Sequence, residues 1–117
     1  MALSRDQILA FDGRLKVEEV EVPEWESSVF VRELTAGERD TFEQLASSFA
    51  KNPNALKDMR ARVAAWAICD KDGTRLFTDT DIGKLTKLGG KALDRILDAV
   101  YALSGLDKDS VEVAEKN

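Results

Sequence analysis

The chain has no histidine and only one cysteine among its 117 residues. Histidine is the commonest general base and the commonest metal ligand of proteins, so its absence removes the usual route to acid–base catalysis and to metal binding. The single Cys69 excludes an intrachain disulfide and a cysteine-rich zinc site. Carboxylates remain, but no acid pair stands out beyond helix capping and surface positions. We therefore expect no enzyme, no catalytic residue, no cofactor and no metal.

Long apolar runs are missing as well. No stretch approaches the roughly 20 apolar residues that span a bilayer. Near the N-terminus, Arg5 and Asp6 stand where a signal peptide would need a basic start and then an unbroken apolar stretch. These features predict a cytoplasmic protein with no membrane partner. The net charge of -5 opposes binding to a phosphate backbone, which disfavours a general nucleic-acid binder.

The residues from 20 to 49 carry the clearest structural signals. Pro23 cannot donate a ladder hydrogen bond and marks a strand end, and the β-branched and aromatic run 29–31 suits a second strand. Thr35 and Glu38 then form a capping box at the start of a helix. The apolar face of that helix consists of Phe42, Leu45, Ala46 and Phe49. A β-ribbon over 15–32 joined directly to a helix is the expected seed of the fold.

The first strand of this ribbon changes phase and is acidic. Leu15 and Val17 share one parity and Val20 and Val22 the other, which predicts a β-bulge or a twist between them. Five glutamates lie between positions 18 and 26. They suit either a solvated face that protects an exposed edge or an acidic docking surface for a basic partner segment.

Periodicity and stop signals place the remaining elements. Ser4 and Gln7 form another capping box, and the short helix that they open is either frayed or packed only when a partner is present. The predicted fold class is mainly α with a small N-terminal β-hairpin (α+β), the helices packing as a small bundle against the hairpin. The expected domain spans residues 1–105, followed by a polar tail over 106–117. Its helices are expected over about 36–50, 55–69, 79–88 and 91–104.

An acidic cluster at 70–81 resembles a calcium loop only superficially. An EF-hand frame that begins at Asp70 requires glycine where Arg75 stands and a bidentate glutamate where the shorter Asp81 stands. Turn chemistry accounts for Asp72 and Gly73, and capping accounts for Thr78 with Asp81. This cluster therefore does not change the expectation of no metal site.

The order of these segments resembles the tail assembly chaperones of long, non-contractile-tailed phages (siphophages). The resemblance covers nearly the whole chain, and each of its motifs is weak alone. The residues that carry the resemblance lie in the segments 4–9, 20–25, 29–35, 38–40, 69–73, 75–79 and 115–117.

The resemblance implies a protein that coats and solubilises the tape measure protein, promotes polymerisation of the tail tube protein around it, and is absent from the mature virion. It also implies a longer form made by programmed minus-one frameshifting, through which the tail tube protein would be reached. The ending Glu115-Lys116-Asn117 permits the slippery heptamer A AAA AAC. Localisation in the host cytoplasm follows, and self-association is left open.

Four aromatic residues are the candidate partner contacts, because aromatics are common energetic centres of interfaces. They are Phe11, Trp25, Phe30 and Tyr101. Packing of the ribbon on the helices is the competing interpretation for Phe30 and Trp25, and a half-buried edge position is the competing one for Tyr101. The alternative function is a small α-helical DNA-binding regulatory protein built on Arg60 and Arg62; a carboxylate-based hydrolase ranks below it.

Overall fold

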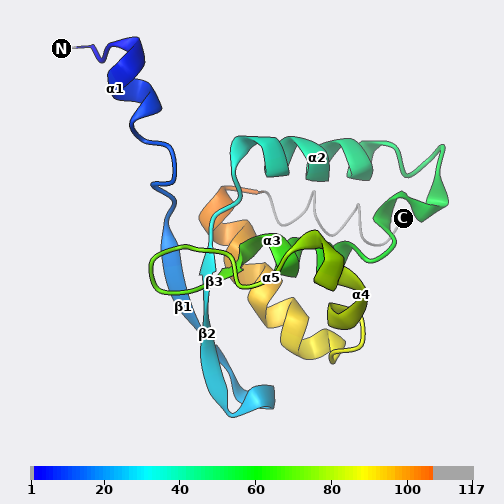
Figure 1. Ribbon diagram of the computed structural model, residues 1–117. Helices are drawn as coiled ribbons and strands as arrows, with labels where there is room; N and C mark the ends of the chain where they lie inside the picture. Colours follow the sequence, from blue (N-terminus) through cyan, green and yellow to red (C-terminus); the bar gives the residue numbers. More distant parts are fainter. Residues whose placement is uncertain (1, 107–117) are drawn as a thin grey trace.

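A three-stranded antiparallel sheet forms one layer of the molecule (Figure 1). The computed structural model describes residues 2–106. Strands β1 (Val17–Val22) and β2 (Ser27–Arg32) form a hairpin, and β3 (Ile68–Cys69) pairs with the other edge of β2. The turn of the hairpin is η1 (Pro23–Trp25), a 3-10 turn that ends at Glu26 with φ 54°. Proline suits the first position of such a turn because its φ is already fixed.

The hairpin has a regular register, so the expected β-bulge is wrong. Pairing runs without interruption from Val17 opposite Arg32 to Val22 opposite Ser27. The phase change has a simpler cause: the two ends of β1 are covered on opposite faces. Val20 and Val22 face the helices, whereas Val17 lies on the other face, where it approaches the turn at Gly73.

The helical part covers one face of the sheet. The helices are α1 (Arg5–Leu9), α2 (Ala36–Ser47), α3 (Met59–Ala67), α4 (Ile82–Leu85) and α5 (Gly90–Ser104), with 3-10 turns η2 (Pro53–Leu56) and η3 (Asp79–Asp81). The long α5 contacts both β1 and β2 and also packs on α3. Its buried stripe supplies Leu93, Ile96, Leu97 and Val100 to the core. The mainly helical α+β class with an N-terminal hairpin is confirmed.

The junction between β2 and α2 is tied by a buried ion pair. Arg32 Nη1 and Nη2 donate to the two carboxylate oxygens of Glu38 at 3.0 and 2.9 Å. The same carboxylate accepts from the Thr35 amide at 2.9 Å, and the Thr35 hydroxyl accepts from the Glu38 amide, which completes the predicted capping box. One glutamate therefore fixes both the helix start and its orientation against the sheet. The same junction is also linked to the end of α5, because Ser104 Oγ accepts a hydrogen bond from the Leu34 amide at 2.9 Å.

The boundaries of three expected helices differ from those observed, and the one expected over about 36–50 ends at Ser47. The helix expected over 55–69 begins at Met59, after η2, and ends at Ala67, because residues 68–69 pair with β2 instead. The one expected over 79–88 is η3 followed by the single turn of α4. The predicted tail lies, except for Leu106, outside the described residues. Over residues 2–106, no helix has both the length and the apolar character needed to cross a membrane.

Candidate binding surface

The hairpin has a second face, opposite the helices, on which Phe30 lies. Alternation along the strands places Val17, Glu19, Glu21, Ser28, Phe30 and Arg32 on this outer face. Phe30 is half-buried and pairs across the sheet with Glu19 on one side and the buried Cys69 on the other. Phe30 thus presents part of an aromatic ring beside acidic side chains of the neighbouring strand.

The glutamates of the hairpin do not all have the same role. Glu24 is held by Arg95 of α5, whose Nε donates to both of its carboxylate oxygens at 2.8 and 3.0 Å. This hydrogen bond is the main reason that the pKa of Glu24 lies below its ordinary value. Glu19 accepts a hydrogen bond from the Ser28 hydroxyl. Within residues 2–106, the exposed carboxylates of Glu18, Glu21 and Glu26 have no hydrogen-bond or ion-pair partner, so they leave the hairpin with uncompensated negative charge.

Trp25 lies in the turn of the hairpin and packs against the core. Its side chain is half-buried, and η1 contacts α5. The neighbouring Glu24–Arg95 ion pair joins the same two elements. Trp25 therefore has a structural role that its acidic sequence neighbours did not reveal.

Tyr101, one of the four predicted partner contacts, is buried. Only 6% of the residue is exposed, and its ring packs against Phe42 of α2 with centroids 5.6 Å apart. In this conformation the ring has no access to another protein. Its position beside the apolar stripe of α5 is covered by α2, a contact between two helices that are far apart in sequence.

The N-terminal arm, defined here as residues 2–14, carries four of the six large apolar side chains that are exposed in the described part of the chain. Helix α1 lies within it and buries no residue, and it projects beyond the end of β1 (Figure 1). Phe11 is 52% exposed, and its ring is covered on one side only by the Arg14 guanidinium, 5.1 Å from the centroid. Other members of this apolar group are Leu3, Ile8 and Leu9, at 53–55% exposure. The predicted capping box of Ser4 and Gln7 is present.

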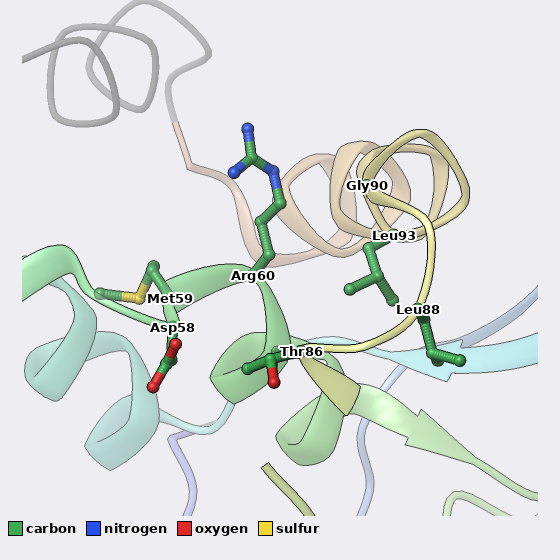
Figure 2. Close-up of a pocket in the computed structure, with 8 residues that line it drawn as sticks. Asp58, Met59, Arg60, Thr86, Leu88, Gly90 and Leu93 are labelled. Carbon is green, nitrogen blue, oxygen red and sulfur yellow. The ribbon is translucent and has the colours of Figure 1, made fainter. Parts of the chain in front are cut away.

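A cavity of about 380 Å³ lies where the start of α3 meets the connection from α4 to α5 (Figure 2). Met59, Leu88 and Leu93 supply its apolar walls. Asp58 and Arg60 bring opposite charges to the lining, so it offers no net charge to an ion. Arg60 Nε also donates to Asp94 at 2.7 Å. This cavity could not be predicted from the sequence, because residues from separate elements form it.

The basic pair proposed for DNA binding does not form an exposed patch. Arg60 is engaged by Asp94. Arg62 is half-buried, and its Nε has no hydrogen-bond partner within residues 2–106. A phosphate backbone is contacted by exposed cations, so this arrangement does not favour the DNA-binding alternative.

The acidic cluster at 70–81 is occupied by turn and capping interactions. Asp70 Oδ1 accepts from the amides of Asp72 and Thr74 at 2.8 and 3.0 Å. Asp81 caps η3 together with Thr78, as predicted. In the described part of the chain, no three histidine, cysteine, aspartate or glutamate side chains form a group able to hold a metal ion.

Sequence reasoning identified Phe11 but missed the rest of the apolar group on the arm. Ile8 and Leu9 lie in the short helix that the Ser4 capping box predicts. The shortness of that helix is the sequence feature that indicates their exposure. A helix of five residues cannot bury a face without a neighbouring element, and none lies close in sequence. Leu76 and Leu88 are also exposed, and they lie in the connections from β3 to η3 and from α4 to α5.

Comparisons with known proteins agree with the fold and the order of the segments. The family model described as phage tail assembly chaperone matches residues 4–117. The solved structure of the bacteriophage HK97 tail assembly chaperone has a similar fold, with a TM-score of 0.62 and 18% sequence identity, covering 86% of this chain and 98% of that chain. No curated protein gives a significant match. Because the family model spans almost the entire sequence, the chain belongs to the phage tail assembly chaperone family.

Proposed function

We propose that this chaperone binds the tape measure protein of its phage, keeps it soluble, and promotes polymerisation of the tail tube protein around it. It acts in the host cytoplasm, without catalysis, and leaves before the virion matures. Family membership supports the general role. Binding to an aggregation-prone client is supported by one observation, the exposed apolar group on the N-terminal arm.

Exposed apolar side chains on the arm do not contribute the stability that their burial would give, so their grouping there points to a role in binding. Burial of apolar surface contributes about 25 cal/mol per Å², and isolated proteins rarely leave large apolar side chains grouped on the surface. The body of this chain buries comparable side chains completely, among them Ile96 and Leu97. An apolar arm on an otherwise acidic protein suits a chaperone: the arm contacts the client, and the charge keeps the complex soluble.

The test is co-expression with the tape measure protein of the same phage. We expect the soluble fraction of the tape measure protein to rise and the two proteins to co-elute on size exclusion. An unrelated acidic protein of similar size, expressed at the same level, is the control. Equal solubility with this control, together with no complex, would refute the proposed function.

Recruitment of the tail tube protein is proposed to require a longer form made by frameshifting at codons 115–117. The sequence Glu115-Lys116-Asn117 permits the slippery heptamer. Mass spectrometry of the products made from the native gene should find a minor, longer chain that shares residues 1–115. Synonymous GAG and AAG codons for Glu115 and Lys116 should abolish that product and leave the short chain unchanged. A longer chain that persists with these codons would rule out this frameshift site.

A further inference from the structure

Two features of the hairpin and arm remain without a partner in the described chain: the apolar side chains of the arm and the uncompensated acids of β1. Both belong to one continuous segment, because the arm leads directly into β1. We propose that the N-terminal arm and the outer face of the hairpin together dock a client segment that is both apolar and basic. This inference rests on the proposed function and specifies the surface and the client chemistry that it requires.

The apolar half of this surface is formed by spacing within α1. Leu3 precedes the cap residue Ser4, and Ile8 is the fourth residue of the helix; these are the positions of a hydrophobic staple, which lie on one side. Phe11 follows Ile8 by three residues, and its amide bonds to the Ile8 carbonyl at 3.1 Å, which continues the same side. An apolar strip therefore extends along α1 although no element of the described body covers it.

The acidic half lies on the outer face of β1. Glu19 and Glu21 are two residues apart and therefore on the same side of the strand, next to the half-buried Phe30 on β2. The Glu21 carboxylate has no hydrogen-bond or ion-pair partner in the part of the chain that the structure describes, and Arg32 on the same face is bound to Glu38. Cations of a bound segment can therefore pair with these carboxylates.

Charge selects the client over a second copy of this chain. Two copies that met through their outer faces would bring Glu19 and Glu21 of each near those of the other, and each chain carries a net charge of -5. Like charges in direct opposition are destabilising. A segment that is both apolar and basic binds favourably to both halves of the surface. Its apolar residues cover the arm, and its cations neutralise the carboxylates of β1.

Two double variants of the full chain, co-expressed with the tape measure protein, test the two halves of the surface. Ile8→Ser with Phe11→Ser removes the apolar strip, and Glu19→Lys with Glu21→Lys reverses the acidic face. We expect each to reduce the tape measure protein that co-purifies by about tenfold, a loss of about 1.4 kcal/mol in binding free energy. The amount of tape measure protein that the unchanged chaperone retains should also fall as the salt concentration rises to about 0.5 M, because salt screens exposed charges.

Matched control variants make the same kinds of substitution at other positions, and so show whether an effect depends on where the substituted residues lie. Leu76→Ser with Leu88→Ser removes two exposed leucines outside the arm, of which Leu88 lines the cavity of Figure 2. Asp40→Lys with Asp98→Lys changes the net charge by the same amount on α2 and α5, at exposed positions. Both controls should retain the tape measure protein within about twofold of the unchanged protein, with unchanged melting temperature for all four variants.

The outcomes distinguish this surface from the function on which it rests. If the unchanged protein retains the tape measure protein and either surface variant does so equally well, the docking surface is refuted and the proposed function stands. Equal losses in a surface variant and its matched control refute it too. If the unchanged protein retains no tape measure protein, both the docking surface and the proposed function are refuted. Sedimentation of the chaperone alone supplies the last check: a mass that drops in the serine variant would assign the arm to a second copy and overturn the proposal.

Discussion

The N-terminal arm and the β2–α2 junction begin with the same local signal and have opposite environments. Each contains a complete capping box, Ser4 with Gln7 in the arm and Thr35 with Glu38 at the junction. At the junction, the capping glutamate also binds the buried Arg32, and α2 packs against α5 through Phe42. In the arm, the capping interactions are exposed and the helix buries nothing.

This difference shows that a capping signal reports where a helix starts but not whether the helix has a neighbour. Capping satisfies backbone donors within a few residues, so it acts at the same strength in both places. Tertiary packing supplies most of the stability of a helix in a protein. The arm is therefore a helix that buries no residue against the described chain, and matched substitutions in the two regions should separate local from tertiary contributions.

The largest contrast is expected from one substitution made in both regions. Ile96 is 0% exposed at the centre of the core, whereas Ile8 is 55% exposed on the arm. Ile96→Ala should lower the free energy of unfolding by about 4 kcal/mol through lost burial and a cavity. Ile8→Ala should change it by less than about 0.5 kcal/mol. Urea denaturation measures both, and a loss of comparable size at Ile8 would mean that the arm packs on the body in solution.

The next contrast compares two arginines. Arg32 and its partner Glu38 have side chains 4% and 16% exposed, whereas those of Arg5 and Asp6 are 82% and 90% exposed. Arg32→Ala should cost about 3 kcal/mol, because it leaves the buried carboxylate without its partner. Arg5→Ala should have no measurable effect, as is usual for exposed pairs. The comparison fails if thermal denaturation shows the same small shift for both variants.

Two aromatic residues give the third contrast, and this one also separates stability from binding. Trp25 packs against the core, so Trp25→Ala should lower the free energy of unfolding by about 2 kcal/mol. Phe11→Ala should leave stability unchanged and weaken retention of the tape measure protein. An unchanged melting temperature in the Trp25 variant, together with lost binding, would instead move Trp25 to the client surface.

The sequence predicted what depends on short-range geometry. All three predicted capping boxes are present. Gly105 ends α5 with a left-handed φ of 72°, a conformation that glycine adopts readily at the end of a helix. The buried stripe of α5 and the burial of Cys69, which raises the pKa of its thiol, also follow from local composition.

What the sequence did not predict depends on contacts between distant segments. Strand β3 is two residues long and follows a helix with no breaker; only its pairing with β2 converts those residues to a strand. Burial of Tyr101 requires α2 to lie across α5, and the regular β1 requires the turn at Gly73 to cover Val17. For the candidate surface, exposure of Ile8 and Leu9 was likewise invisible in their helical spacing, which is equally typical of buried residues.

The smallest contrast tests the capping boxes themselves. Thr35→Ala removes the hydroxyl that accepts from the Glu38 amide at 3.1 Å and should cost about 1 kcal/mol of global stability, because α2 unfolds with the body. Ser4→Ala removes the equivalent acceptor for Gln7, but α1 can unfold without exposing any buried residue, so global stability should not change. NMR secondary shifts of residues 5–9 should nevertheless move toward coil values in the Ser4 variant. If Ser4→Ala lowered the urea midpoint as much as Thr35→Ala does, the arm would share the cooperative unit of the body, and its apolar side chains would not be free to meet a client.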